Sequence, residues 1–428
     1  MRIAIVNRYR SIIGGVESYL DCVMLQLDYA GHQIAFLYEQ DGSERHARIA
    51  IPPSATVWRL ADANVSAIAA LKDWRPDLIY VHGVADLETE AELIELAPAV
   101  FFAHAYTGTC VAGEKAFKFP RARPCERRFG WQCLTHYYPR RCGGLNPRTM
   151  MAEYARQSAR LALLRRYDAI VTASAFMRAE YARHGFECVY QVGLPLPRGG
   201  QDIPPRVVED TAARDKDPRY WRLLFAGRMM PLKGGAMLLE ALPQAAAVLA
   251  RPLKLAFAGD GPARAAWEAK ARGLEARHSS LKINFTGWVA HDQLAGLYQD
   301  ADLLVMPSLW PEPFGLSGAE AGLYGLPTVA YAVGGIPEWL HDGVNGHLAP
   351  ADPPTTAGLA DAIIACLRDR DHYQRLCEGA RVSSRRMTIS NHLGRLLEVF
   401  SAVRQGVGRN RIGKLRPNDY AVQPRGVD

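Results

Sequence analysis

One segment in the C-terminal half of the chain reads Pro307-Ser-Leu-Trp-Pro-Glu-Pro-Phe-Gly-Leu-Ser-Gly-Ala-Glu-Ala-Gly-Leu-Tyr-Gly-Leu-Pro327. It follows the apolar run Leu303–Met306, passes through a loop rich in Gly and Pro, and continues with helical periodicity from about Leu316. A strand, a glycine loop and a helix form the unit of a parallel sheet, which binds ligands where its strands end. Glu312 lies in the loop and Glu320 about one turn into the helix. Both carboxylates can therefore face a ligand held at the helix N-terminus.

Strand and helix patterns alternate through both halves of the chain. In the N-terminal half we predict strands at Arg2–Val6, His32–Leu37, Leu78–Val81, Val100–Ala103 and Ala169–Thr172, and a helix over Val16–Leu27. In the C-terminal half we predict strands at Arg222–Phe225, Lys254–Ala258, Ile283–Thr286, Leu303–Met306 and Thr328–Tyr331, and a helix over Ala357–Arg368. The pattern predicts an α/β protein with two Rossmann-like domains that face each other across a cleft.

The domain boundaries follow from a break in composition. A Gly- and Pro-rich stretch at 193–200, followed by Ile203-Pro-Pro-Arg206, is typical of an interdomain linker. We therefore predict an N-terminal domain over 1–200, with a basic, cysteine-containing insertion at about 105–150. A C-terminal domain over 201–385 follows. Residues 386–428 are expected to form a helix and a loose basic tail.

A second motif places two cations at the end of a predicted strand. It reads Phe225-Ala-Gly-Arg-Met-Met-Pro-Leu-Lys-Gly-Gly235, so that Arg228 and Lys233 lie in a glycine-containing loop. Arginine chelates phosphate oxygens and lysine acts as a point charge, which suits a diphosphate. Two further loops can bring backbone close to a nucleotide; they contain Gly259, Gly261, Trp288 and Val289.

Together these motifs resemble the family 4 glycosyltransferases, which have the GT-B fold. The resemblance covers 223–348 and rests on the E-x7-E pair, the Gly-Arg…Lys-Gly loop, the Gly-Asp-Gly-Pro turn at 259–262, Phe285-Thr-Gly, Gly334-Gly-Ile-Pro-Glu338 and Asp342-Gly-Val-Asn-Gly346. The N-terminal resemblance is limited to Gly14-Gly-Val-Glu17 and Phe101-Phe-Ala-His104.

The resemblance implies specific roles for residues of this chain. Arg228 and Lys233 would hold the donor diphosphate, Glu320 the ribose hydroxyls, and Glu312 the transferring sugar. The residues implied in donor binding are Gly14, Gly15, Gly227, Arg228, Lys233, Gly259, Gly261, Trp288, Val289, Glu312, Phe314, Gly315, Leu316 and Glu320. Those implied in catalysis are His104, Glu312, Arg228 and Lys233. Ala105 follows His104 where many members carry Asp, which puts the partner of His104 in doubt.

The activity that the resemblance implies is transfer of a sugar from a nucleotide diphosphate to a glycan or lipid-linked acceptor, with retention at the anomeric carbon. Synthesis of bacterial polysaccharide, lipopolysaccharide or glycolipid is the expected setting. No cofactor is expected in catalysis, because Arg228 and Lys233 can balance the charge of the leaving group. Two other functions remain open: a nucleotide-sugar 2-epimerase of the same fold, and a protein that binds nucleic acid or another anion. No nucleic-acid-binding module is recognisable in the sequence.

The positive charge of the chain is concentrated in one segment. The net charge is +7 over 428 residues, yet 114–166 holds thirteen Lys and Arg against three Glu, a local net charge of +10. Aromatic residues lie among these cations, a mixture that suits an anionic membrane surface. A solvated basic face is the alternative. No signal peptide or membrane span is evident, so we expect a cytoplasmic protein that binds peripherally to the inner face of the membrane.

Four of the eight cysteines lie in the insertion predicted at about 105–150: Cys110, Cys125, Cys133 and Cys142. Four cysteines in one loop can form a tetrahedral structural zinc site. Their spacing contains no C-x2-C pair, so disulfides and free thiols remain alternatives.

Overall fold

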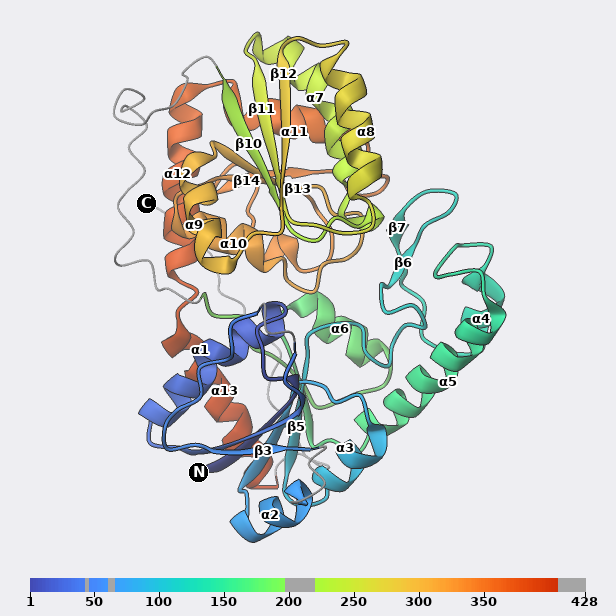
Figure 1. The fold of residues 1–428 in the computed structure, drawn as a ribbon, viewed down its shortest axis with the longest axis vertical. Coiled ribbons are helices and arrows are strands. Elements are labelled where there is room, and N and C mark those ends of the chain that lie inside the picture. Colours follow the sequence, from blue (N-terminus) through green and yellow to red (C-terminus); the bar gives the residue numbers. More distant parts are fainter. Residues whose placement is uncertain (43–45, 61–65, 197–219, 407–428) are drawn as a thin grey trace.

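Two parallel β-sheets, each covered by helices on both faces, form the two halves of the protein (Figure 1). The computed structural model describes residues 1–42, 46–60, 66–196 and 220–406. Most of the predicted linker, including 203–206, and the basic tail from 407 lie outside the described residues. None of the described helices combines the length and the hydropathy that a membrane crossing requires.

The first sheet has seven parallel strands in the order β3-β2-β1-β4-β5-β8-β9. Their bounds are β1 Arg2–Tyr9, β2 Gln33–Gln40, β3 Thr56–Arg59, β4 Leu78–Val81, β5 Ala99–Ala103, β8 Ala169–Thr172 and β9 Val189–Gln191. All five predicted strands of this half are confirmed. The sequence analysis missed β3 and β9, whose residues are only partly buried. Edge strands carry less of the continuous apolar pattern that marks a buried strand.

Alternate side chains of the first sheet enter two separate cores. Ile3 and Ile5 pack on one face of the sheet, whereas Ala4 and Val6 pack on the other. The helices of this half are α1 Gly15–Tyr29, α2 Ala67–Trp74, α3 Leu87–Leu93, α5 Pro147–Leu164 and α6 Ala175–Arg183. Burial on both faces explains why these strands read as nearly uninterrupted apolar runs.

The second sheet has six parallel strands in the order β12-β11-β10-β13-β14-β15. Its strands are β10 Trp221–Ala226, β11 Leu253–Ala258, β12 Leu281–Gly287, β13 Leu303–Met306, β14 Thr328–Tyr331 and β15 Gly346–Ala349. Its helices are α7 Gly235–Leu249, α8 Arg264–Glu275, α9 His291–Asp300, α10 Leu316–Leu323, α11 Thr356–Leu367 and α12 Arg370–Arg385. The predicted strands and helix of this half are confirmed, and β15 is the strand that was missed.

The insertion lies between β5 and α5 and has little regular structure. It contains a two-stranded antiparallel ribbon, β6 Ala116–Phe117 and β7 Arg123–Pro124, and the short helix α4 Gln132–Tyr137. The ribbon, α4 and α5 form a projecting arm beside the first sheet (Figure 1). The basic, aromatic segment of the sequence therefore forms a distinct surface.

The last helix, α13 Ile389–Arg404, returns to the first half of the molecule. It packs against α1 and β5, as its position below α12 in Figure 1 shows. The chain therefore crosses back to the first sheet between α12 and α13, and the domain boundary expected at 386 stays a prediction.

Candidate functional site

Two loops meet where the strand order of the second sheet reverses, between β10 and β13. The loop after β10 carries Lys233, and the loop after β13 carries Glu312. Lys233 Nζ donates to Glu312 Oε1 at 2.6 Å, and the hydroxyl of Ser308 donates to the same oxygen. Glu312 is only 5% exposed. A parallel sheet leaves room for a ligand at such a reversal point, so the two predicted residues lie in the expected place.

Glycine permits the close packing of these loops. A Cβ on Gly234 would come within 1.7 Å of the carbonyl oxygen of Pro307, and Gly234 has a φ of +73°. Gly315 has a φ of +88° and precedes the first turn of α10. The backbone N–H groups at the start of α10 are thereby left without helical partners, as the predicted role of Phe314, Gly315 and Leu316 requires.

Glu320 lies on α10 and is 8% exposed. Burial raises the pKa of Glu320 to about 7, and the neighbouring Tyr298 hydroxyl acts in the opposite direction. Two carboxylates therefore lie around one helix N-terminus in different environments. Glu312 is paired with a lysine, whereas Glu320 has no cation beside it among the described residues.

Arg228 is exposed and has no ion-pair partner among the described residues. A Cβ on the adjacent Gly227 would meet open space. Gly259 and Gly261 differ: a Cβ there would lie 2.1 Å from Gly227 O and 2.4 Å from Met229 O, respectively. The contact that requires glycine at these two positions is therefore with the chain's own backbone.

The remaining predicted donor residues occupy different environments. Trp288 is 61% exposed, and its ring lies edge-on to that of His46 with the centroids 5.8 Å apart. Val289 is half-buried against the core of the second sheet. Phe314 is buried, and its carbonyl accepts a hydrogen bond from Trp339 Nε1 at 2.7 Å.

Gly14 and Gly15 lie at the corresponding reversal point of the first sheet, between β1 and β4. A Cβ on Gly15 would meet open space, and one on Gly14 would lie 3.9 Å from Glu17 Oε2, an ordinary contact distance. Glu17 fixes the loop: its carboxylate accepts from Gly14 N at 3.0 Å and from Asn7 Nδ2 at 3.3 Å. This carboxylate is thus occupied in holding the glycine loop.

His104 follows β5 and forms a pair with His82, which follows β4. His82 Nδ1 and His104 Nε2 are 2.8 Å apart. Burial lowers the pKa of His104 to about 3 and that of His82 well below its ordinary value, with a smaller contribution from neighbouring histidines. His82 is therefore the neutral partner of His104.

A second hydrogen-bonded chain lies beside this pair and reaches α13. His392 Nδ1 is 2.8 Å from Gly193 O, and its Nε2 is 2.8 Å from the Tyr19 hydroxyl, which is 2.8 Å from that of Tyr80. A carbonyl oxygen can only accept, so His392 carries its proton on Nδ1. It follows that Tyr80 donates to Tyr19, and that Tyr19 donates to His392.

Residues of the first half hold the loop that carries Glu312. The Tyr106 hydroxyl donates to Pro311 O, and Ser174 Oγ donates to Pro313 O at 2.6 Å. Trp310 packs into the core on the outer face of the first sheet. Because these contacts flank Glu312 on both sides, the position of this carboxylate depends on both halves of the molecule.

Glu338 joins the two halves at a further point. Its carboxylate accepts from Phe176 N at 3.2 Å and from Gln191 Nε2 at 2.7 Å. Glu338 thus caps the first turn of α6, which belongs to the other sheet. No sequence pattern links residues this far apart in the chain, so the sequence analysis could not identify Ser174, Tyr106 or Gln191.

The four cysteines of the insertion converge on one small cavity. These four cysteines are free thiols. No three His, Cys, Asp or Glu side chains of the described residues are arranged to hold a metal ion. The zinc alternative therefore gains no support, although the sequence correctly grouped these residues.

Three Asp-x-Asp triplets, a common form of metal-binding motif in sugar transfer, occur in the chain. Asp215 and Asp217 lie outside the described residues. In the triplet at 300–302, Asp302 Oδ2 accepts from Arg222 N at 2.8 Å. In the triplet at 369–371, Asp369 Oδ1 accepts from His372 N at 2.6 Å and caps α12. Asp369 thus has a structural role as a helix cap.

Two family models match the chain, one in each half. Residues 13–190 match the model described as Glycosyltransferase Family 4, and residues 221–369 match the one described as Glycosyl transferases group 1. The first range begins after β1 and ends within β9, and the second contains all six strands of the second sheet.

Individual relatives match over shorter stretches. The chain is 37% identical over 145 residues to the uncharacterized glycosyltransferase MJ1607 of Methanocaldococcus jannaschii, covering 33% of this chain and 35% of that relative. It is 34% identical over 183 residues to a D-inositol 3-phosphate glycosyltransferase of Xylanimonas cellulosilytica, covering 42% of each. These matches span less than half the length of the curated relatives.

The fold as a whole resembles that of solved glycosyltransferase structures. The crystal structure of Anabaena Alr3699/HepE in complex with UDP and glucose superposes with a TM-score of 0.63 and 19% sequence identity. The superposition covers 94% of this chain and all of HepE. The arrangement of two facing parallel sheets is therefore that of the GT-B fold.

Proposed function

This chain belongs to the family 4 glycosyltransferases and has the GT-B fold, and from that premise we propose that it transfers a sugar from a nucleoside diphosphate with retention at the anomeric carbon. The observation that carries this proposal is the pairing of Lys233 with Glu312 at the reversal point of the second sheet, beside the free cation of Arg228.

Each part of this site has a role in the proposed reaction. Arg228 and Lys233 bind the diphosphate and balance the charge that develops on it as the glycosidic bond breaks. Glu320 accepts hydrogen bonds from the ribose hydroxyls. Glu312 and the N–H groups at the start of α10 hold the sugar, and His104 approaches it from the first half.

Replacement of Lys233 tests this assignment. Lys233→Ala removes one charge-assisted hydrogen bond, worth about 1.5–3 kcal/mol, so kcat/KM should fall roughly tenfold to a hundredfold. Lys270→Ala is the matched control, because Lys270 also pairs with a glutamate, Glu240, but on the outer helix α8. Equal rates for the Lys233 variant, the control and the parental protein would refute the site.

Stereochemistry and metal dependence are tested with the parental protein. A thermal-shift screen of nucleotide sugars identifies the donor, because a ligand at a hundred times its Kd stabilises by about 2.7 kcal/mol. NMR of the first-formed product should show the anomeric configuration of the donor. Transfer should persist in EDTA, because Arg228 and Lys233 provide the positive charge. An inverted product, or activity that only magnesium or manganese restores, would contradict the proposal.

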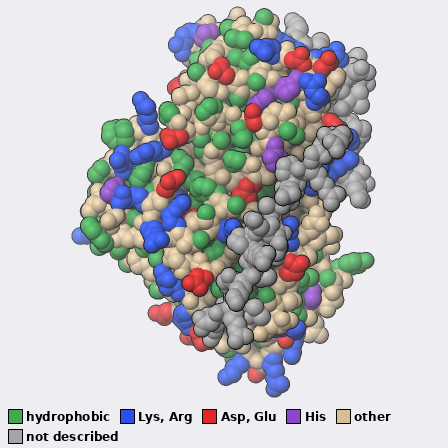
Figure 2. Space-filling view, turned by 180° about the vertical axis from the view of Figure 1, so that it is seen from behind, with side chains coloured by type: hydrophobic (Ala, Val, Ile, Leu, Met, Phe, Trp, Pro, Cys, Tyr) green, Lys and Arg blue, Asp and Glu red, His purple; other side chains and the backbone are tan. Residues whose placement is uncertain are grey.

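We also propose that the acceptor is linked to a lipid and that the insertion binds the membrane surface that presents it. Four large apolar side chains of the arm are exposed: Phe119, Trp131, Leu145 and Met151. Lys and Arg side chains lie among hydrophobic ones along this edge, the left edge in Figure 2. Cations near an anionic surface add about 1 kcal/mol each, and aromatic rings lie at headgroup level.

Liposome co-sedimentation tests the membrane proposal. The parental protein should sediment with anionic vesicles and remain in the supernatant with neutral ones or in high salt. The variant Arg121→Ser/Arg128→Ser/Trp131→Ser changes exposed residues only and should lose this binding. Equal recovery in the supernatant with neutral and anionic vesicles would refute it.

A further inference from the structure

We propose that a polar cavity between the insertion and α5 binds a neutral, hydroxyl-rich group of the acceptor, either a sugar ring or a polyol. The cavity has a volume of about 340 Å³, within the range of small-molecule sites. It is formed by the loop after β5, the end of α4 and the middle of α5. This inference rests on the proposed transferase function, since it assigns the substrate on the other side of the reaction.

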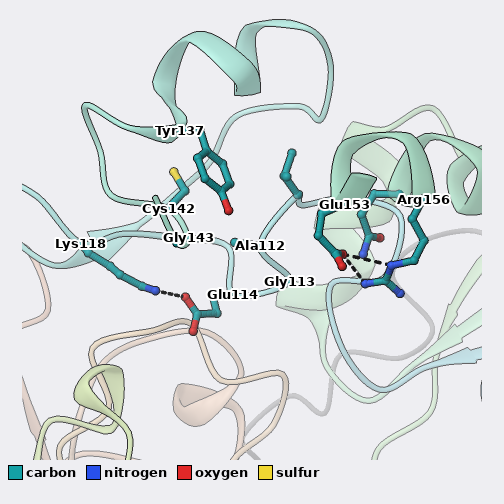
Figure 3. A pocket seen from close by; sticks show the side chains of 12 residues that line it. Ala112, Gly113, Glu114, Lys118, Tyr137, Cys142, Gly143, Glu153 and Arg156 are labelled. Atoms are coloured by element: carbon teal, nitrogen blue, oxygen red, sulfur yellow. Dashed lines mark hydrogen bonds and ion pairs between the residues drawn. The ribbon is translucent and has the colours of Figure 1, made fainter. Parts of the chain in front are cut away.

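Two ion pairs face each other across the cavity. Lys118 Nζ lies 2.6 Å from Glu114 Oε2 on one side, and Arg156 donates to Glu153 Oε2 through Nε at 3.0 Å and Nη2 at 2.5 Å on the other. The hydroxyl of Tyr137 points into the space between the two pairs (Figure 3).

The charges of this lining indicate the class of ligand. Each pair is neutral as a whole, so the cavity offers no net attraction to an anion such as phosphate. Both pairs remain partly exposed, which leaves lone pairs of the carboxylates and N–H groups of the cations free for a ligand. Donors and acceptors in alternation, with an aromatic hydroxyl between them, match the hydroxyl groups of a sugar.

The chain around the cavity is built to hold this arrangement. A Cβ on Gly143 would come within 2.1 Å of the Tyr137 hydroxyl, so only glycine permits the tyrosine to reach the cavity. Lys115, next to Glu114, is 2% exposed and forms an ion pair of 2.5 Å with the buried Glu180 of α6. The loop that carries Glu114 is therefore anchored to α6 by this ion pair.

The same anchor relates the cavity to the proposed donor site. Glu180 lies on α6, and Ser174, at the N-terminus of that helix, donates to Pro313 O beside Glu312. The chain also runs directly from His104 past Tyr106, which contacts Pro311, to Glu114. Both Figures 1 and 3 draw the arm beside loops of the C-terminal half. The cavity thus lies on the acceptor side of the same cleft.

A neutral probe and a matched pair of double variants test the inference. Saturation-transfer NMR measures binding of methyl α-D-glucopyranoside and of myo-inositol to the protein in the presence of UDP. The variant Glu153→Gln/Arg156→Gln removes one pair of the cavity. The control Glu378→Gln/Arg381→Gln removes an (i, i+3) pair of nearly identical geometry on α12, with Nε at 3.0 Å and Nη2 at 2.6 Å from Glu378 Oε2.

We expect at least one probe to bind the parental protein and the control, and its signal to fall at least about fivefold in the cavity variant. Absence of binding to the parental protein, an unchanged signal in the cavity variant, or an equal loss in the control would each overturn the subsite. Stabilisation by UDP, measured as a shift in Tm, should be the same in all three proteins. If UDP did not stabilise the parental protein, this would count against the proposed function. The NMR signal of the sugar probe would still show whether the cavity binds a sugar or polyol.

Discussion

Glu320 combines its proposed contact with the donor ribose with a cost in stability. Burial raises the pKa of this carboxyl to about 7 in the folded protein, above the ordinary value of 4.5. The folded state therefore holds the proton more tightly, and its stability decreases as the pH rises from about 4.5 to 7. The ribose hydroxyls of a donor require the opposite state, because an ionised carboxylate is the stronger acceptor.

The change Glu320→Gln should separate these two effects. At pH 8 the variant should melt at a higher temperature than the parental protein, because it lacks a buried unpaired charge. Its Kd for UDP should be higher and independent of pH, whereas parental binding should tighten as the pH rises through about 7. Calorimetry at pH 6 and pH 8 measures both quantities. A lower Tm together with an unchanged affinity would contradict this account.

His82 determines which nitrogen of His104 carries the proton. One of the two facing nitrogens must donate, and His82 Nε2 is buried without a hydrogen-bond partner among the described residues. If His104 donated, His82 would keep a buried N–H without an acceptor, which is rarer in folded proteins than a buried unpaired acceptor. We therefore expect His82 Nδ1–H to donate, which leaves an N–H on Nδ1 of His104.

Long-range ¹H–¹⁵N NMR of the imidazole nitrogens measures this tautomer directly. His104 should be protonated on Nδ1 in the parental protein. In His82→Leu it should shift towards Nε2–H, and kcat should fall about tenfold through the loss of one oriented hydrogen bond. His82→Gln, whose amide can donate to His104 Nε2, should restore both the tautomer and most of the rate. An Nε2–H tautomer in the parental protein would disprove the assignment.

Helix α6 anchors the insertion as well as the loop of Glu312. Lys115 and Glu180 form a buried ion pair, and Phe129 N donates to His184 Nε2 at 2.8 Å. An insertion with little regular structure and a small apolar core of its own depends on such attachments. Glu180 also pairs with the partly exposed Arg183 at 2.6 Å. Removal of Lys115 therefore takes one of two cations from a buried carboxylate, at a cost below the roughly 3–5 kcal/mol of a fully uncompensated charge.

Lys115→Met should therefore loosen the insertion. Limited trypsinolysis should cut the variant within 121–128 under conditions that leave the parental protein intact. The double change Lys115→Met/Glu180→Leu should recover resistance, because replacing both charges leaves neither unpaired. If the single and double variants are digested at the same rate, the ion pair is not the anchor.

A few hydrogen bonds connect the two halves. They involve the loop that carries Glu312 and the carboxylate of Glu338. Glu338→Ala removes the acceptor for both Phe176 N and Gln191 Nε2. Loss of a charge-assisted hydrogen bond, about 1.5 kcal/mol, should shift the balance between closed and open arrangements about tenfold towards the open one. Small-angle X-ray scattering should detect a larger radius of gyration.

Glu338→Gln keeps one acceptor oxygen, so its radius of gyration should lie between those of Glu338→Ala and the parental protein. Glu398→Ala on the exposed face of α13 should have no effect. Identical scattering curves for all four proteins would show that Glu338 does not hold the halves together.

Local patterns of the sequence were sufficient to predict the architecture. They also predicted those parts of the candidate site that lie in the loop after a single strand. Apolar runs that are buried on both faces predicted the central strands. The glycine loops after β10 and β13 predicted Arg228, Lys233, Glu312 and Glu320 as candidate site residues. The edge strands β3, β9 and β15 were not predicted, because their residues are only partly buried and their apolar pattern is therefore weaker.

The partners of these residues depend on contacts between distant parts of the chain. The pairing of Lys233 with Glu312, the support of Glu312 by Tyr106 and Ser174, and the cap that Glu338 provides for α6 all join separate segments. The tertiary fold also explains Gly259 and Gly261, which the sequence associated with a nucleotide, through contacts with neighbouring backbone. A side chain's type and its place on a strand are local properties, but its pKa, its hydrogen-bond partner and its distance from another loop arise only when the sheets are assembled.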